Sequence, residues 1–419
     1  MKDIQSLIQG VRGCACGKTH NCPIEAVVIR EHALDALPAL CATCARILLV
    51  ADENTWAACG KAAAEQVRER LQKALVLADS RAVVIPNEAR IAEIERALQP
   101  DTDLIIGVGS GVINDLCKHV SFRHGLPYFI IATAPSMDGY ASVGAALILN
   151  GMKETLNARP PRAILADTKV LAAAPADMIR SGWGDIIGKY SCLNDWRLSA
   201  LINGEYFCRA VYDLVMETAD EVRALAPEIR AGDAAAVGRL TEALVAVGIA
   251  MSYVGNSRPA SGSEHHLSHF FEITGILDHT PYFPHGTDVL YASVVTARLR
   301  QRILQGTCHA DGFDRARWER EIRRVYTSSA EEVIALQDRA GRYETDELPV
   351  IRAKWREIRQ ILADAPTPDD MLAMIADIGM DYHEFETLYG EAKIRDAIAY
   401  AKDLKDRYTV LWLYDRWFA

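Results

Sequence analysis

Apolar runs alternate with amphipathic stretches between residues 46 and 160, a pattern typical of a parallel β-sheet covered by helices on both faces. Strands are predicted at residues 46–51, 82–86, 103–108 and 126–132, and helices at residues 56–75 and 112–122. Beyond residue 170 apolar residues recur every three or four positions, as in residues 236–253 and 289–304. We therefore expect an α/β N-terminal domain of the Rossmann-like, nucleotide-binding type and an all-α C-terminal domain.

The expected domain junction is the proline pair Pro160-Pro161, because consecutive prolines prevent a helix from continuing. The prediction is a dinucleotide-binding α/β domain over residues 1–165, including a cysteine-rich N-terminal segment. A helical metal- and substrate-binding domain is expected over residues 166–419, with Trp412 near its end packed against the other helices.

Composition narrows the class of protein. The chain has 419 residues and a formal net charge of −10, which argues against a general nucleic-acid binder. An anionic substrate would have to meet a local cluster of cations or a helix N-terminus. No apolar segment resembles a signal peptide, and no stretch is expected to approach the roughly 20 apolar residues of a membrane-spanning helix. We expect a cytoplasmic protein with no membrane partner.

Five of the ten cysteines lie before residue 45, and reduced thiols are the default expectation. The run Cys14-Ala-Cys16-Gly-Lys-Thr-His20-Asn-Cys22, followed by Cys41-Ala-Thr-Cys44, offers soft ligands at short spacing and could hold a structural zinc ion. The spacing fits no standard zinc finger, and buried thiols without a metal are the alternative.

Three glycines lie at the end of the strand predicted at residues 103–108 and directly after it, in Gly107-Val-Gly109-Ser110-Gly111, with Asp115 one turn further on. Backbone N–H groups at such a helix start can face a pyrophosphate, although a tight turn without a ligand is the alternative. The spacing departs from the Rossmann fingerprint and lacks the ending of a P-loop, which disfavours kinase chemistry. Asp52, after the first strand, could bind an adenosine ribose or cap the next helix.

A polar loop, residues 133–142, follows the strand at residues 126–132, at the carboxyl edge where open α/β sheets bind ligands. The hydroxyls of Thr133, Ser136 and Ser142 suit a cofactor. Asp138, the only charged residue of the loop, is a candidate for holding a substrate hydroxyl, although an aspartate before glycine is also a common turn former.

Three histidines lie within five residues in His265-His266-Leu-Ser-His269, on a predicted helix. The spacing of four puts His265 and His269 on one face about 6 Å apart, so one can bind a metal ion while the other handles a proton or the substrate. His285, before a glycine at the start of another helix, is the preferred second histidine ligand, and His279 is its rival.

Asp185, in Gly-Trp-Gly-Asp, is the candidate carboxylate ligand. Its alternative role is to cap a helix over residues 186–201. One carboxylate and two imidazoles leave a coordination position open, as in catalytic rather than structural metal sites.

In this order, the segments resemble the iron-containing alcohol dehydrogenase and dehydroquinate synthase superfamily. Within it they resemble the sn-glycerol-1-phosphate dehydrogenases, especially a bacterial branch first noticed beside arabinose-utilisation genes. The resemblance extends from the cysteine-rich opening to the helical end. It implies a cleft between the two domains, a pyrophosphate turn at residues 109–111 with Asp115, and a nicotinamide and substrate loop at residues 133–142. It also implies metal ligation by Asp185, His265 and His285.

The implied reaction is the reversible reduction of dihydroxyacetone phosphate to sn-glycerol 1-phosphate with NADH or NADPH and one divalent ion. Zinc, nickel and ferrous iron all suit the ligands. By resemblance, His269 or a water molecule would deliver the proton and Asp138 would orient a substrate hydroxyl. Lys189 is the first candidate to bind the phosphate, and the alternatives are Lys153, Arg159 and Arg258. Asp52 favours NADH at least as much as NADPH.

Three other functions stay open. The chain could be a glycerol or other polyol dehydrogenase acting on an unphosphorylated substrate, or a carbocycle-forming enzyme like dehydroquinate synthase, which uses glutamate where this chain has Asp185. It could also be a non-catalytic dinucleotide-binding protein. The expected partners are a small phosphorylated substrate and a second copy of the chain in a homodimer.

Overall fold

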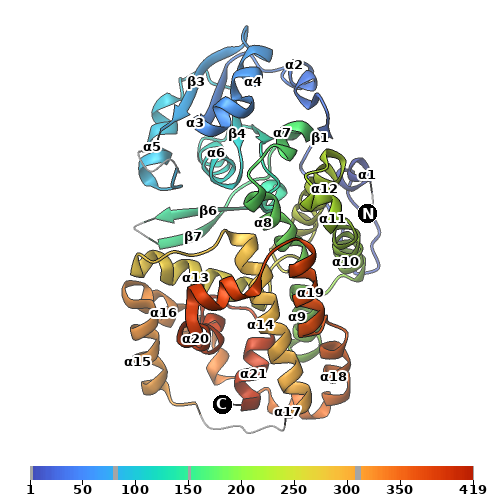
Figure 1. Ribbon diagram of the computed structural model, residues 1–419. Helices are drawn as coiled ribbons and strands as arrows, with labels where there is room; N and C mark the ends of the chain where they lie inside the picture. The colour runs from blue at the N-terminus through green and yellow to red at the C-terminus, as the bar shows by residue number, and fades with distance from the viewer. Residues whose placement is uncertain (1–2, 79–83, 150–151, 307–312, 419) are drawn as a thin grey trace. The chain divides into compact units, whose positions relative to one another are not determined.

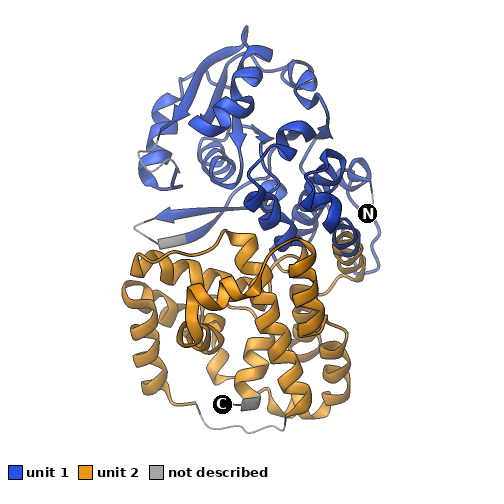
Figure 2. Ribbon diagram, viewed as in Figure 1, with its two compact units in different colours: residues 1–186, 220–257 blue, residues 187–219, 258–419 orange. Residues whose placement is uncertain are grey.

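A computed structural model describes residues 3–78, 84–149, 152–306 and 313–418. The chain forms two compact units: unit 1 consists of residues 1–186 and 220–257, and unit 2 of residues 187–219 and 258–419 (Figure 2). Unit 1 contains a parallel sheet with its helices, and unit 2 is helical (Figure 1). This confirms the predicted fold class. The predicted boundary between residues 165 and 166 separates a dinucleotide-binding domain from a metal- and substrate-binding domain. This assignment of binding roles stays a prediction.

Six parallel strands form the sheet of unit 1 in the order β1-β8-β5-β4-β2-β3. Their bounds are β1 Ala26–Arg30, β2 Ile47–Asp52, β3 Leu71–Leu77, β4 Leu104–Gly109, β5 Tyr128–Ala132 and β8 Ala163–Asp167. Strands β6 (Gly144–Leu149) and β7 (Met152–Asn157) form a separate antiparallel hairpin. The ligand-bearing edge predicted for this sheet lies at the carboxyl ends of β2, β4 and β5.

The helices of unit 1 cover both faces of the sheet. They are α1 Ile4–Ile8, α2 Leu37–Leu40, α3 Glu53–Thr55, α4 Lys61–Gln66, α5 Glu88–Ala97, α6 Gly111–Arg123, α7 Thr168–Ala172, α8 Ala176–Ile187, α11 Ala226–Arg230 and α12 Ala234–Val254. Every residue of β4 is buried, as expected for a strand with helices on both faces. The apolar residues of one face pack with α2 and α4, and α6 packs against β4 on the other.

The structure corrects two predicted elements of unit 1. The helix predicted at residues 56–75 ends at Gln66 after a π-helical turn at Trp56–Gly60, and residues 71–77 form the edge strand β3 instead. Residues 84–86 are not a strand, and residues 82 and 83 lie outside the described part of the chain. The helical spacing continued into Leu71–Leu77 by chance, and pairing with β2 decided its conformation.

Helix α12 corrects a third expectation. It is long and apolar enough to cross a membrane, contrary to what the sequence suggested, but 78% of its apolar window is buried inside the protein. Helix α12 packs against α1, α7 and β1 of the same unit. It is therefore a core helix of unit 1.

Unit 2 is built from helices around α14. Its helices are α9 Lys189–Asn203, most of α10 (Arg209–Ala224), α13 Ser263–Asp278, α14 His285–Gln305, α15 Arg315–Tyr326, α16 Ala330–Ala340, α17 Leu348–Ala353, α18 Trp355–Ala363, α19 Pro368–Asp377, α20 Tyr382–Tyr400 and α21 Val410–Phe418. Trp412 of α21 is buried in an apolar cluster with residues of α9, α14 and α18, as predicted.

Candidate metal and cofactor site

Three predicted histidines converge within unit 2. His265 and His269 lie on α13, and His285 is the first residue of α14. The ring centroids of His265 and His285 are 5.0 Å apart, and those of His269 and His285 are 5.6 Å apart. His265 and His269 are separated by 6.2 Å, close to the distance expected from their spacing on one helix face. Two helices thus bring three imidazoles together.

A buried carboxylate orients the first of these imidazoles. The Nδ1 atom of His265 lies 2.6 Å from Oε1 of Glu264, and both side chains are buried. A carboxylate can only accept this hydrogen bond, so Nδ1 carries the proton and Nε2 presents its lone pair. Burial raises the pKa of Glu264, but the hydrogen bonds from His265 and from the backbone N–H of Gly262 contribute to holding that pKa below its usual value. This is the carboxylate–histidine arrangement that supports metal ligands.

The start of α13 is fixed by a buried acid. Oδ2 of Asp195, on α9, accepts hydrogen bonds from the backbone N–H and the hydroxyl of Ser263, at 2.7 and 2.6 Å. Its Oδ1 pairs with Arg300 of α14 at 3.1 Å and accepts from the N–H of Val410 at 2.9 Å. Because charged hydrogen bonds in a dry interior are strong, Asp195 fixes the two histidine-bearing helices relative to α9.

Asp185 lies in unit 1, in the last turn of α8. The alternative role as the cap of a helix over residues 186–201 is wrong, because α8 continues to Ile187 and α9 starts separately at Lys189. The Asp185 side chain is fully buried, and its Oδ2 accepts a hydrogen bond of 2.9 Å from the backbone N–H of Asp138. A buried carboxylate held at one oxygen by a backbone donor has the orientation that a metal ligand requires.

The alternative ligand His279 lies at the C-terminal end of α13, whereas His265 lies in its first turn. It is the C-cap of α13, in the left-handed conformation with φ 55°, and it is exposed. Fourteen residues separate it from His265, a distance of about 21 Å along a helix. His279 therefore cannot share an ion with His265.

The loop of residues 133–142 is clamped by its neighbours in unit 1. A Cβ atom at Gly182 of α8 would lie 1.7 Å from the carbonyl oxygen of Pro135, so only glycine permits this contact. The hydroxyl of Ser181 donates to the carbonyl of Ser136 at 3.2 Å. Asp138 itself is buried, in a 3₁₀ turn at Asp138–Ala141. The loop is therefore a rigid part of the unit.

Lys118, which was not a predicted site residue, binds the end of this loop. Its fully buried Nζ donates to the carbonyls of Gly139 and Gly144, at 2.7 and 2.9 Å, and to the hydroxyl of Ser142 at 3.1 Å. Burial lowers the pKa of Lys118 to about 8, against the opposing effect of Asp115. The predicted cofactor hydroxyl of Ser142 is thus engaged with Lys118 and with the carbonyl of Gly139, 2.9 Å away.

The glycine turn has the predicted strand-to-helix geometry. Gly109 ends β4 and Ser110 is the N-cap of α6, without a side-chain hydrogen bond to the helix. A Cβ atom at Gly109 would lie 2.6 Å from Ile113, so glycine allows α6 to start directly at the strand end. Asp115 accepts a hydrogen bond from the N–H of Ala146 at 3.1 Å and thereby ties α6 to β6.

The other predicted cofactor residues lie at the same edge of the sheet. Asp52 ends β2, and its carboxylate forms a capping box with Thr55, accepting from the Thr55 N–H at 2.8 Å. The capping role considered for Asp52 is therefore present, and a role in ribose binding stays a prediction. Thr133 directly follows β5 and is buried, and Ser136 is half-buried.

Two buried cations, Lys189 and Arg258, and the half-buried Arg407 surround the segment that leads into α13. Lys189 donates to the carbonyl of Ala260 at 3.1 Å, and Arg407 donates to the carbonyl of Ser261 at 2.7 Å. Arg258 opens the segment and donates to the carbonyl of Tyr408 at 2.7 Å. Lys189 and Arg258 were predicted phosphate-binding candidates, whereas Arg407 was not predicted, because it lies 149 residues after Arg258 and follows no motif.

Two of these cations lie close enough for their charges to repel each other. Burial lowers the pKa of Arg407 to about 10, and the positive charge of Arg258 lowers it further. Glu205 pairs with Arg258 at 3.0 Å. Of the other two candidates, Lys153 lies in β7, and Arg159 lies over the ring of Phe122 at 5.5 Å. A group of cations beside a helix N-terminus favours an anionic ligand.

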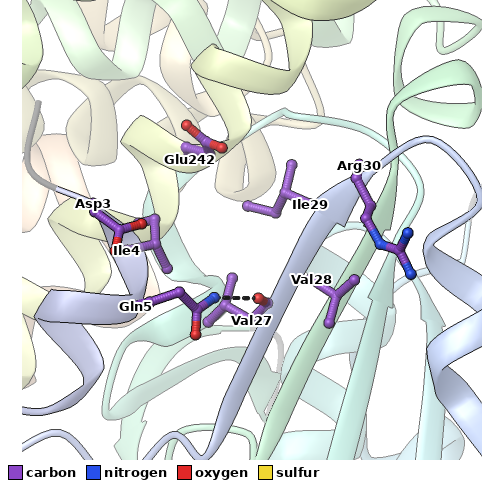
Figure 3. Close-up of a pocket in the computed structure, with 8 residues that line it drawn as sticks. All are labelled: Asp3, Ile4, Gln5, Val27, Val28, Ile29, Arg30 and Glu242. Carbon is purple, nitrogen blue, oxygen red and sulfur yellow. Dashed lines mark hydrogen bonds between the residues drawn. The ribbon is translucent and has the colours of Figure 1, made fainter.

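A cavity of about 310 Å³ lies elsewhere in unit 1, between α1 and the edge strand β1 (Figure 3). The side-chain amide of Gln5 donates to the carbonyl of Val27 across it, at 2.9 Å. Its lining contains none of the predicted site residues: Asp3, Ile4, Gln5, Val27, Val28, Ile29, Arg30 and Glu242. This cavity is therefore separate from the predicted site residues.

Comparison with known proteins defines the class. The family model of the iron-containing alcohol dehydrogenases matches residues 28–175. An archaeal halo-thermophilic alcohol dehydrogenase from a Red Sea brine pool has a similar fold, with a TM-score of 0.62 at 13% identity over 95% of this chain and 98% of that one. The chain belongs to the iron-containing alcohol dehydrogenase family, as the resemblance implied.

Within that family its relatives are more specific. The chain is 30% identical to a glycerol-1-phosphate dehydrogenase [NAD(P)+] of Geobacillus stearothermophilus, over 90% of this chain and 88% of the relative. It is 29% identical to the protein of the same name from Bacillus licheniformis, over 98% and 94%. The chain groups with the glycerol-1-phosphate dehydrogenases, and the predicted class of NAD(P)-dependent, metal-containing oxidoreductases is confirmed.

Proposed function

We propose that the chain catalyses the reversible reduction of dihydroxyacetone phosphate to sn-glycerol 1-phosphate with NADH or NADPH. The main support is the similarity to glycerol-1-phosphate dehydrogenases over nearly the full length of both chains. The cation cluster of Lys189, Arg258 and Arg407 adds chemical support, because an enzyme acting on unphosphorylated polyols has no need of it.

Asp185, His265 and His285 are the proposed ligands of one divalent ion, which can be zinc, nickel or ferrous iron. The donor set fits such an ion: Glu264 leaves Nε2 of His265 available, the ring of His285 lies 5.0 Å from that of His265, and Asp185 is oriented by a backbone N–H. A divalent ion bound here would polarise the substrate carbonyl and stabilise the negative charge that develops on its oxygen.

Two side chains of the protein are proposed to act on the substrate directly. His269 is half-buried beside His285 and can hold a proton at its ring for delivery to the oxygen of the product. Asp138 is buried, and its carboxylate can accept a hydrogen bond from a substrate hydroxyl. Since the backbone of Asp138 is fixed by Asp185, this group is positioned before substrate binds.

For the phosphate we propose Lys189, with Arg258 and Arg407 as the supporting cations. Lys189 and Arg407 donate to backbone carbonyls of the segment that leads into α13, and Arg258 begins that segment. A phosphate dianion bound among them would accept charge-assisted hydrogen bonds from these side chains.

The cofactor is proposed to bind at the carboxyl edge of the sheet. Its pyrophosphate would lie at the start of α6, at Gly109, Ser110 and Gly111, because the backbone N–H groups of that first turn favour an anion. The remaining proposed cofactor residues are Asp52, Asp115, Thr133, Ser136 and Ser142. With a carboxylate at the end of β2, NADH is expected to serve at least as well as NADPH.

We also propose a cytoplasmic homodimer. The core position of α12 supports a protein that is not embedded in a membrane. Closed two-fold dimers are the commonest assemblies of soluble enzymes.

The test is an assay of NADH oxidation on protein stripped of metal by a chelator. Dihydroxyacetone phosphate should be reduced only after a divalent ion is returned, and the product should be the sn-1 enantiomer. Dihydroxyacetone is the matched substrate without phosphate, and its kcat/KM should be at least about 100-fold lower. Equal rates for both substrates would indicate a polyol dehydrogenase instead. In Asp185→Ala, turnover should fall at least about 1,000-fold while NADH binding persists.

A further inference from the structure

The N-terminal segment of residues 10–22 contains a second group of metal-binding side chains, apart from the proposed function. Val11 and His20 form an antiparallel bridge with two backbone hydrogen bonds of 2.9 Å, which closes the segment into a loop. Within it the N–H of Gly17 donates to the carbonyl of Cys14 at 2.9 Å. These turns gather Cys14, Cys16 and His20, whose ligand atoms all lie within 4.8 Å of one another.

The imidazole of this group is oriented for a ligand. Nδ1 of His20 lies 2.9 Å from the backbone carbonyl of Tyr253, which can only accept, so Nδ1 carries the proton. Nε2 then presents its lone pair and lies 3.4 Å from Sγ of Cys16. A ring nitrogen held by a backbone carbonyl, with the other facing a thiol, is the arrangement found around zinc.

The distances suit a tetrahedral ion. Bonds of about 2.3 Å to sulfur and about 2.1 Å to nitrogen place neighbouring ligand atoms roughly 3.6 Å apart. The separation of Cys16 and His20 is already 3.4 Å, and the remaining ones are at most 4.8 Å. A small inward movement of the thiol-bearing loop completes the geometry.

The loop also lacks a core of its own. From residue 11 to residue 19 no side chain is buried, and most are exposed. Apolar contacts therefore contribute little to the ordering of this segment, which is the situation in which small folds use a metal as a cross-link. The other early thiols differ, because Cys41 and Cys44 are buried in the apolar core of the sheet, and burial raises the pKa of each.

We propose that Cys14, Cys16 and His20 bind a structural zinc ion that fixes the N-terminal loop to helix α12 through the carbonyl of Tyr253. Binding releases one proton from each of the two thiols, and the thiolates with the imidazole supply three of the four ligands. The ion is separate from the catalytic ion, whose proposed ligands are oxygen and nitrogen only.

Cobalt substitution tests the proposal without measuring turnover. The full-length protein, stripped of metal and loaded with Co²⁺, should show sulfur-to-cobalt charge-transfer absorption, which a site of one carboxylate and two imidazoles cannot give. The double variant Cys14→Ser/Cys16→Ser should lose this absorption and about one equivalent of bound zinc per chain. Cys22→Ser, a half-buried thiol just beyond the loop, is the matched control and should retain both.

The absence of the absorption from the wild-type protein, or its persistence in the double variant, would overturn the assignment. Loss of zinc from Cys22→Ser to the same extent would overturn it as well. Should the double variant fail to fold, X-ray absorption at the zinc edge of the wild-type protein decides. A sulfur shell at about 2.3 Å supports the site, and a spectrum with only nitrogen and oxygen neighbours refutes it. Failure of the dehydrogenase assay alone leaves this result unaffected.

Discussion

Oε1 of Glu264 and Nδ1 of His265 lie 2.6 Å apart, between adjacent residues in the first turn of α13 and in a fully buried environment. Glu264 was not predicted as a metal ligand, because it acts on the metal site through its neighbour His265. It is a positioning residue: it fixes the tautomer of His265 and increases the basicity of Nε2.

Glu264→Gln should weaken metal binding about 10- to 100-fold, because the amide lacks the charge and can present N–H to the ring. We expect the loss in metal titrations of the apoprotein, and we expect excess metal to restore most of kcat. Glu272→Gln, a half-buried residue further along the same helix, is the control. An unchanged metal affinity in Glu264→Gln would show that the carboxylate serves only the packing of α13.

Gly182→Ala should destabilise unit 1 and disturb the loop of residues 133–142. The added Cβ would lie 1.7 Å from the Pro135 carbonyl, so either α8 or the loop must move. We expect a loss of about 1–3 kcal/mol in the free energy of unfolding, together with a higher KM for NADH. Ser181→Ala, which removes one hydrogen bond of 3.2 Å to the same loop, should cost about 1 kcal/mol or less. Wild-type stability in Gly182→Ala would contradict this packing.

Lys118 should give the stability of the protein a distinctive pH dependence. Burial lowers its pKa to about 8 in the folded protein, against about 10.4 in an unfolded chain. Between these values the unfolded chain holds a proton that the folded protein has released, so the free energy of unfolding rises with pH. Lys118→Met removes this effect, and the stability of the wild type relative to the variant should grow by up to about 3 kcal/mol from pH 8 to pH 10.4.

Urea unfolding across this pH range measures the difference, and other titrating groups cancel because both proteins share them. Lys73→Met, which replaces an exposed lysine of β3, should give a flat difference. A flat or falling difference for Lys118→Met would mean that Lys118 stays charged in the folded protein throughout.

The sequence predicted those site residues whose positions depend on a local pattern. His265 and His269 share a helix face because four residues nearly complete a turn, and Gly109-Ser110-Gly111 form a strand-to-helix turn because glycine permits the close contact with Ile113. Arg407 and Lys118 carry no such signal, because their partners lie 146 and 21 to 26 residues away. The edge strand β3 was missed for the same reason, since its conformation depends on pairing with β2.

Arg407 should distinguish phosphorylated from unphosphorylated substrates. Its half-buried guanidinium lies near Arg258 and donates to the Ser261 carbonyl at the start of α13, and a planar guanidinium is well suited to binding a phosphate. In Arg407→Met we expect the kcat/KM for dihydroxyacetone phosphate to fall about 10- to 100-fold, mainly through KM, while the low activity with dihydroxyacetone changes less than about threefold. Arg302→Met, an exposed position on α14, is the control and should leave both values unchanged.

Added inorganic phosphate should inhibit the wild type more strongly than Arg407→Met, because phosphate and the substrate would compete for the same cations. An equal loss with both substrates would assign Arg407 to the stability of α13 rather than to phosphate binding.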